Sequence, residues 1–254
     1  MVLDFLKNVI TSNKDCSTER IKLVEANGLQ SSYIGPQTGK RIDVKEFGVG
    51  AYIVPGMFEA LKRLDKLVKI NKGTLYITDL FRTFLQQKYL RERYEETKKV
   101  YACKPGQSFH NAGRAVDIDI QNLNFDRMPK ENWLQILWDL AKPLGFNPVI
   151  SDPDIDKSEA WHFEYIDKDW QFCYDNWSHS EVAKACVLDC GKWEEENKEK
   201  LKIFFIQSQL IRLGHFSIGI IDGILGNKTK STLINLGISD FNNLDDIVFK
   251  LKNE

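Results

Sequence analysis

The sequence has almost no excess charge and no long apolar run. Its 254 residues include 35 basic and 36 acidic side chains, for a formal charge of −1. Nucleic-acid-binding proteins carry a strong excess of positive charge, and so do polybasic proteins of the membrane surface. The near-equal numbers of basic and acidic residues therefore argue against both functions for the whole chain. No run of about 18 apolar residues occurs, which argues against a membrane-spanning helix and a stable membrane association. Small molecules, peptides and glycans remain as partners.

Cysteine is scarce and irregularly spaced. The chain has five cysteines and no CxxC pair, which argues against thiolate zinc sites. An odd count leaves at least one thiol unpaired, so we expect no full disulfide framework. Cys186 and Cys190 are four residues apart and would share one face of a helix, which we interpret as packing.

The first residues also lack a signal-peptide pattern, because Asp4, Lys7 and Asn8 interrupt a short apolar stretch. We therefore expect synthesis in the cytoplasm without Sec export. Residues 1–50 have weak periodicity and are interpreted as a leader, with a short helix at 1–10. Gly, Ser, Gln and Pro are frequent over 26–40, which predicts loops there.

Beyond the leader, helical and strand patterns alternate. Pro55 opens a helical pattern that ends at 71–73, where the sequence reads Asn-Lys-Gly. Further helices are predicted at 85–98, 131–140 and 180–185. Strands are predicted at 74–80, 115–120 and 161–165.

Two imidazoles and one carboxylate stand in a pattern that fits a metal hydrolase. His110, Asp117 and His162 form a common three-ligand set for catalytic zinc, with water in the fourth position. The two histidines favour a zinc-like ion over magnesium or calcium. His110 and Asp117 are seven residues apart and would face opposite sides of a straight strand, so they converge only if the chain bends. Gly113 supplies the permissive residue for that bend.

Glu159 precedes His162 by three residues, so it can stand beside a metal without binding it. There it can accept a proton from the nucleophilic water and pass it to the leaving amine. Other residues remain alternatives to the assigned site residues. They are Asp119, which shares a strand face with Asp117, and also His179 and Glu164. His215 is interpreted as structural.

These residues lie in two motifs, SFHNAGRAVD at 108–117 and EAWH at 159–162. Together they resemble the SxHxxGxAxD and ExWH motifs of the VanY-like zinc D-alanyl-D-alanine carboxypeptidases of peptidase family M15. That group also includes dipeptidases and L-alanyl-D-glutamate endopeptidases of phage lysins. The resemblance implies an α+β domain with a small central antiparallel sheet flanked by helices, Zn²⁺ on His110, Asp117 and His162, and Glu159 as the catalytic base.

The family also has an upstream segment like YRSxxxQ, which FRTFLQQ at 81–87 resembles. Arg82 at the end of a strand would hold the scissile carbonyl oxygen as charge develops, or else clamp a substrate carboxylate. The alternative to both roles is that Arg82 forms an ion pair on the protein surface. Ser108 and Gln87 are substrate contacts by resemblance alone, and Trp161 either lines the pocket or is a buried strand aromatic.

The C-terminal part carries a second resemblance. Gln207, Leu210, Gly214 and Thr229 match the QxxLxxLG…DGxxGxxT pattern of the peptidoglycan-binding type 1 domain, as do Leu213, Asp222, Gly223 and Gly226. A small three-helix domain is therefore expected over 198–254, after a peptidase domain over 1–193. A helical bundle used for dimerisation is the alternative.

Both resemblances point to the bacterial cell wall. The expected function is hydrolysis of peptidoglycan stem peptides by a phage endolysin-like zinc peptidase, released by a holin or a secretion system. One alternative is a D,D-carboxypeptidase that trims terminal D-alanine. The other is a non-catalytic wall-binding protein with a structural metal site. Such a site needs no catalytic base, so the presence of Glu159 three residues before His162 argues against this alternative.

Overall fold

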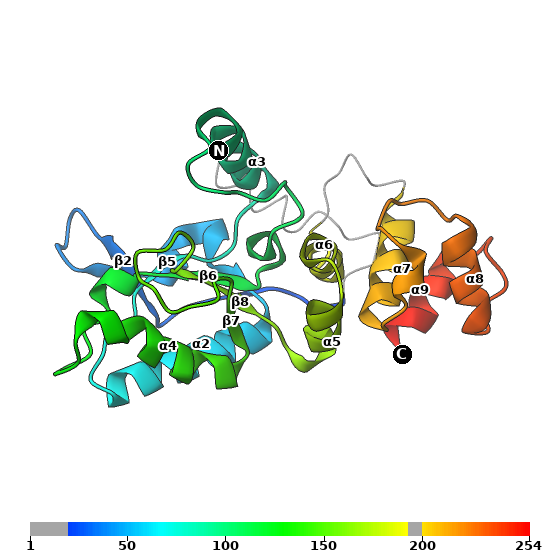
Figure 1. Ribbon diagram of the computed structural model, residues 1–254. Coiled ribbons are helices and arrows are strands. Elements are labelled where there is room, and N and C mark those ends of the chain that lie inside the picture. The colour runs from blue at the N-terminus through cyan, green and yellow to red at the C-terminus, as the bar shows by residue number, and fades with distance from the viewer. Residues whose placement is uncertain (1–19, 193–199) are drawn as a thin grey trace.

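The computed structural model describes residues 20–192 and 200–254, and its centre is a six-stranded sheet (Figure 1). In order across the sheet, the strands are β3 (Arg41–Asp43), β2 (Gln30–Ile34), β5 (Ile77–Asp79), β6 (Ala115–Ile118), β8 (His162–Tyr165) and β7 (Phe146–Pro148). All neighbours are antiparallel except β2 and β5, which are parallel. A separate antiparallel pair joins β1 (Val24–Glu25) to β4 (Tyr52–Ile53). The α+β class is confirmed.

Helices flank the sheet. Helices α2 (Pro55–Ile70) and α4 (Trp133–Ala141) lie on one side, and α3 (Phe84–Thr97) lies on the other (Figure 1). Helices α5 (Lys168–Asn176) and α6 (His179–Asp189) lead to α7 (Leu201–Arg212), α8 (Asn227–Asn235) and α9 (Leu244–Lys252). Short 3-10 helices complete the described chain: η1 (Val44–Ala51), η2 (Phe109–Ala112), η3 (Ile120–Asn122), η4 (Lys130–Asn132), η5 (Lys142–Leu144) and η7 (Phe216–Ile218). Within 20–192 and 200–254, no helix has the length and apolar character needed to cross a membrane.

Helix α2 follows directly from its sequence. Pro55 occupies the first turn, where its missing N–H costs no hydrogen bond. Met57, Leu61, Leu64 and Val68 recur every three or four residues and are all buried. They pack in one core cluster with the apolar residues of β5 and β6, which leaves the polar face of those strands toward α3.

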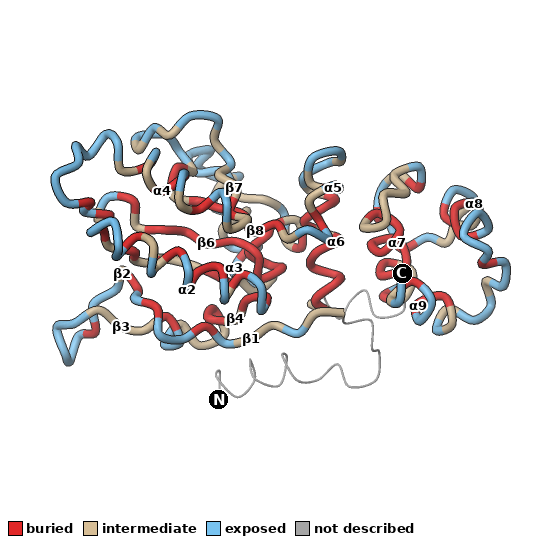
Figure 2. Tube along the Cα trace, turned by 90° about the horizontal axis from the view of Figure 1, so that it is seen from below, coloured by how far each residue is buried: buried red, intermediate tan, exposed pale blue. Residues whose placement is uncertain are grey.

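A second core cluster lies beyond the sheet. It joins buried residues of η2, α5 and α6 to those of α7, α8 and α9, and α6 is buried along most of its length (Figure 2). Cys186 and Cys190 are free, buried members of this cluster, as the packing interpretation expected. The predicted boundary between 193 and 198 lies outside the described residues, and the two-domain division stays a prediction.

The predicted loops over 26–40 are wrong in part, because β2 (Gln30–Ile34) belongs to the main sheet. Its sequence, QSSYI, has no apolar alternation, and only Ser31 is buried. Pairing with β3 and β5 therefore fixes this strand, rather than a hydrophobic face. The helix predicted at 1–10 lies outside the described residues.

Candidate metal centre

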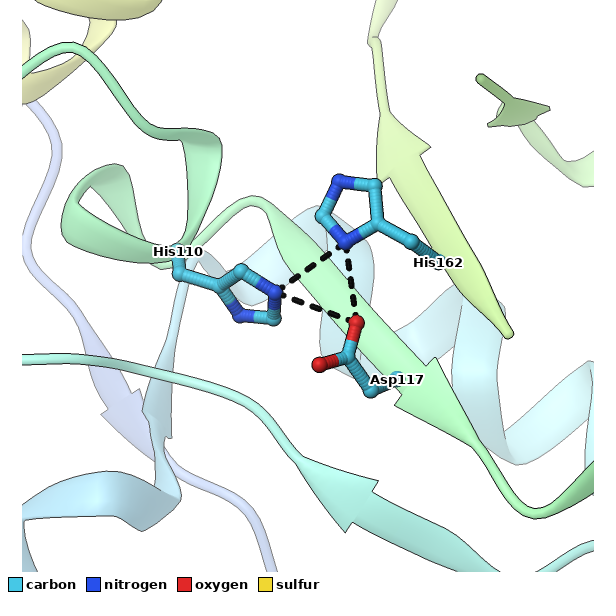
Figure 3. A group of neighbouring side chains, drawn as sticks. All are labelled: His110, Asp117 and His162. Carbon is cyan, nitrogen blue, oxygen red and sulfur yellow. Dashed lines mark hydrogen bonds and ion pairs between the residues drawn. The ribbon is translucent and has the colours of Figure 1, made fainter. Parts of the chain in front are cut away.

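Three side chains from separate elements point toward one another (Figure 3). His110 belongs to η2, Asp117 to β6 and His162 to β8. His162 Nδ1 lies 2.9 Å from Asp117 Oδ1 and 3.1 Å from His110 Nε2, and His110 Nε2 lies 3.2 Å from Asp117 Oδ1. All three residues are buried. The sequence prediction of which residues converge here agrees with this geometry.

The backbone explains the convergence. Gly113 ends η2 with φ 63° and turns the chain into β6, which is the bend that the seven-residue spacing requires. A Cβ at this position would also lie 3.0 Å from Leu23 and 3.1 Å from the Cα of Ile53. Asp117 and His162 are direct partners across the antiparallel β6–β8 pair, so their side chains emerge side by side on one face.

The donor set fits a zinc ion. Its ligand atoms lie within 4.8 Å of one another, and their 2.9–3.2 Å separations are close to the edge of a tetrahedron. Zinc bonds of about 2.0–2.1 Å would place tetrahedral ligands about 3.3 Å apart. Among the described residues, this is the group of histidine, cysteine and acidic side chains able to hold a metal.

A further polar contact, on the side away from the metal position, also orients each ligand, as is usual for metal ligands in proteins. His110 Nδ1 donates to the carbonyl of Leu80, which leaves Nε2 free to face the metal position. His162 Nε2 lies 3.5 Å from Glu164 Oε1, which leaves Nδ1 facing inward. Asp117 Oδ2 accepts a 2.7 Å hydrogen bond from Arg82 Nη2, so Oδ1 is the oxygen presented to the histidines.

Electrostatics keep the Asp117 carboxyl ionised. Burial alone would raise its pKa, but the charges and hydrogen bonds of His110 and His162 lower that pKa well below its ordinary value. In the absence of a metal, His162 is affected in the opposite sense. Burial would lower its pKa, but hydrogen bonds to Asp117 and Glu164 raise that pKa to about 10. A metal ion would take the place of this proton.

Two of the alternative ligands lie just behind the centre rather than in it. Glu164 follows His162 by two residues on β8, so both side chains emerge on the same face. The buried Glu164 accepts 2.7 Å hydrogen bonds from His179 Nε2 and from the Tyr174 hydroxyl. Burial opposes its ionisation, but hydrogen bonds from both histidines lower its pKa to about 2. Glu164 is an alternative from the sequence without a stated pattern, although the period of two along β8 relates it to His162. Nothing in the sequence pointed to Tyr174.

The third alternative, Asp119, is not part of the centre. It lies past the end of β6 and accepts hydrogen bonds of 2.9 and 3.1 Å from the Asn122 side chain. The predicted strand 115–120 ends at Ile118, so the shared face expected for Asp117 and Asp119 does not continue. His215 lies between α7 and η7, outside the centre.

Glu159 stands at the edge of the metal centre in a strained turn. It is half-buried and adopts the left-handed backbone conformation, with φ 67°, which is unfavourable for residues other than glycine and often marks a functional site. Its carbonyl accepts the N–H of His162 at 3.0 Å. Burial is the main cause that raises the pKa of its carboxyl, while His162 and Arg82 oppose the shift. Its sequence separation from His162 gave no indication of this conformation.

Arg82 lies between two carboxylates on neighbouring strands. Its Nε donates to Asp79 at 2.6 Å, while its Nη2 donates to Asp117. Asp79 and Asp117 are register partners across the β5–β6 pair, which explains why one guanidinium reaches both. Burial would lower the pKa of Arg82, but both carboxylates raise it. The ion pair considered from the sequence is thus present, inside the site rather than on the surface.

The three expected substrate contacts have different surroundings. Ser108 is buried and its hydroxyl accepts the backbone N–H of His110 at 3.3 Å, which caps η2. Gln87 is buried and donates to the carbonyl of Cys103 at 2.9 Å. Trp161 lines a cleft together with Arg82 and Glu159. Trp161 therefore has the placement that a substrate contact needs, whereas Ser108 and Gln87 make structural contacts.

The C-terminal motif residues form an internal clamp. The buried Gln207 of α7 donates from Nε2 to Asp222 Oδ1 at 2.8 Å and accepts the Gly223 N–H at 2.9 Å. Its Nε2 also lies 3.5 Å from the Thr229 hydroxyl. These contacts join α7 to the turn before α8. The motif therefore identifies how this part folds and does not identify glycan contacts.

Comparisons with known proteins agree with the motifs. Residues 50–168 match the VanY family, described as D-alanyl-D-alanine carboxypeptidase. The peptidoglycan L-alanyl-D-glutamate endopeptidase CwlK of Bacillus subtilis (strain 168) is 32% identical over 94 residues, which are 32% of this chain and 56% of that protein. The match thus spans about half the length of this curated relative.

The structure of the LdcB LD-carboxypeptidase is also similar, with 22% identity and a TM-score of 0.43 over 67% of this chain and 78% of the other. The sequence match at 50–168 includes all three convergent ligands and Glu159. Over residues 50–168 this chain is therefore similar to the VanY family.

Proposed function

We propose that this chain is a zinc-dependent peptidase that hydrolyses amide bonds in peptidoglycan stem peptides. The observation that carries the proposal is the convergence of His110, Asp117 and His162, each held by a further polar contact. Arg82, which is hydrogen-bonded to Asp117, lines a cleft together with Glu159. A structural zinc site needs a fourth protein ligand. The described residues supply three, which favours a catalytic site over a structural one.

The residues of the chain divide the chemistry between them. Zinc bound here would supply Lewis acidity, which lowers the pKa of water and polarises the scissile carbonyl. The Glu159 carboxylate accepts the proton of the attacking water and donates it to the leaving amine. Arg82 has two of its nitrogens on Asp79 and Asp117, and its Nη1 is left to donate to the carbonyl oxygen as negative charge develops.

The placement of Arg82 bears on which bond is cut. A clamp for a terminal carboxylate uses two parallel N–H groups of one guanidinium. Two of the Arg82 nitrogens are already engaged within the protein, so the structure gives less support to that role than to the single hydrogen bond above. We therefore favour an endopeptidase, the activity named for the relative CwlK, over a D,D-carboxypeptidase.

We further propose that residues 198–254 hold the enzyme on the wall and that it acts there as an endolysin-like lytic enzyme. The support is the match of Gln207, Asp222, Gly223 and Thr229 to the wall-binding motif and their assembly into one clamp. Binding of the whole chain and of a Gln207→Leu variant to purified peptidoglycan sacculi tests this part separately from cleavage.

The test of activity is digestion of purified peptidoglycan by the zinc-loaded wild type and by Glu159→Ala, with mass spectrometry of the released muropeptides. We expect new amino termini at one amide bond for the wild type, and loss of these products for Glu159→Ala. Glu131→Ala, an exposed carboxylate on η4, is the matched control and should retain activity. Equal products from the wild type and Glu159→Ala, or no products from the zinc-loaded wild type, would contradict the proposal.

A further inference from the structure

A cleft of about 380 Å³ lies beside α3, and it reaches the metal centre through Arg82, which is hydrogen-bonded to Asp117. Arg82, Glu159 and Trp161 line its inner end. The outer wall consists of the second half of α3 and the segment 99–102 that follows it. A peptide that places an amide bond beside Glu159 would therefore have its neighbouring residues against this outer wall.

The outer wall carries two cations that the protein does not neutralise. Arg93 and Lys99 both line the cleft and are exposed. Within residues 20–192 and 200–254, neither side chain makes an ion pair or a hydrogen bond. Neighbouring Arg91, in contrast, is paired with Glu95 at 2.7 Å. Two positive charges that line the cleft thus remain available to a ligand.

The carboxylates near the cleft do not compensate these charges. Among the described residues, Glu159 is the one acidic residue that lines it, and Arg82, which also lines it, is already balanced by Asp79 and Asp117. The charge that remains unbalanced at the outer wall is therefore positive. Such a wall attracts carboxylates, and charge-assisted hydrogen bonds give the attraction its strength.

Aromatic rings also line the cleft. Tyr94 and Tyr101 line the cleft and contact each other edge to face, with ring centroids 5.2 Å apart. Tyr101 is exposed, so its ring offers an apolar surface in the cleft that Arg93 and Lys99 also line. The wall matches a short peptide in which a carboxylate lies next to small apolar side chains.

We propose that Arg93 and Lys99 bind a free carboxylate of the peptide substrate, and so make the enzyme selective for stem peptides whose carboxylate is not amidated. This inference rests on the proposed peptidase function and specifies its substrate class. The two cations act on binding, because they lie on the outer wall and not beside Glu159. Their loss is therefore expected in KM rather than in kcat.

The test uses two synthetic pentapeptides, L-alanyl-γ-D-glutamyl-L-lysyl-D-alanyl-D-alanine and the same peptide with D-isoglutamine in place of D-glutamate. With zinc-loaded full-length wild type, kcat/KM should be about tenfold higher for the carboxylate peptide, as expected for charge-assisted contacts. The double variant Arg93→Gln/Lys99→Gln should reduce this preference to within about twofold, through KM. Both positions are exposed, so the variant should fold, which its circular dichroism checks.

The control is Lys66→Gln/Lys88→Gln, which removes the same charge from exposed positions that do not line the cleft. It should keep the wild-type preference. Equal cleavage of both peptides by the wild type, or an unchanged preference in Arg93→Gln/Lys99→Gln, would overturn the inference while the peptidase function stands.

A binding measurement tests the carboxylate site if neither peptide is cleaved. Fluorescence anisotropy of the two labelled peptides with metal-free protein measures affinity without turnover. If neither peptide is cut, but the wild type binds the carboxylate peptide more tightly and the Arg93→Gln/Lys99→Gln variant does not, the proposed function fails and the carboxylate site is supported. If binding shows no preference either, the site is excluded as well.

Discussion

The carboxylate behind His162 should control how tightly the centre binds zinc. Glu164 Oε1 lies 3.5 Å from His162 Nε2 and is fixed by hydrogen bonds from His179 and Tyr174. It thereby orients the imidazole and raises its basicity toward a metal on Nδ1. Replacing Glu164 should weaken zinc binding, although Glu164 touches no position that a metal would occupy.

The size of the effect depends on what replaces the carboxylate. Glu164→Gln keeps one oxygen that accepts the His162 N–H and loses the negative charge, so we expect about a tenfold weaker affinity. Glu164→Ala removes the acceptor and also leaves the Tyr174 hydroxyl without its partner, so we expect about a hundredfold. These factors correspond to about 1.4 and 2.7 kcal/mol of binding free energy.

Competition with a chromogenic chelator measures the zinc affinity, and urea unfolding of the metal-free protein measures any loss of the fold. Glu181→Gln is the control, because Glu181 is a buried carboxylate on α6 that accepts the N–H of Ile221 at 2.9 Å and belongs to no part of the centre. It should leave zinc affinity unchanged. Zinc affinities of Glu164→Gln and Glu164→Ala equal to that of the wild type, in folded proteins, would refute the reasoning.

Three further predictions concern stability. Burial raises the folded-state pKa of Glu159 above the unfolded value, so the contribution of Glu159 to stability is favourable at low pH and is lost as pH rises through the folded-state pKa. Urea unfolding of the metal-free proteins should therefore show Glu159→Gln becoming more stable relative to the wild type as pH rises through that pKa. A stability difference that does not change with pH would contradict this prediction. Glu159→Gly should be about 1 kcal/mol more stable than Glu159→Ala, because φ is 67°; equal unfolding midpoints would argue against strain. Gln207→Leu leaves the N–H groups of Asp222 and Gly223 without their acceptor. It should therefore lower the free energy of unfolding by about 2–3 kcal/mol. An unchanged free energy of unfolding would return Gln207 to the candidates for glycan contact.

The sequence was most informative where a local pattern alone determines the structure. The apolar spacing from Met57 to Val68 and the Pro55 start predicted α2 (Pro55–Ile70) closely. The bend at Gly113 followed from the need for His110 and Asp117 to converge, and the backbone adopts the positive φ that glycine permits. Both conclusions depend on residues that are close together in the chain.

Features that depend on long-range pairing were not accessible in this way. The register that places Asp79 and His162 on either side of Asp117 arises from three strands that are far apart in the sequence. Consequently the two carboxylates that engage Arg82 could not be named. Likewise, β2 (Gln30–Ile34) has no alternation of its own and is a strand because its neighbours pair with it.

The metal centre and the C-terminal helices are connected more closely than two separate modules would be. Behind His162, Glu164 is hydrogen-bonded to His179, the first residue of α6. Helix α6 in turn shares a core cluster with α7, and Gln209 of α7 donates to the buried Asp189 at 3.1 Å. Removing 198–254 would therefore expose apolar residues of α6 and leave Asp189 without this hydrogen bond. The structure thus predicts that the C-terminal helices stabilise the helix that orients Glu164, so any wall-binding role would be carried by helices that also support the metal centre.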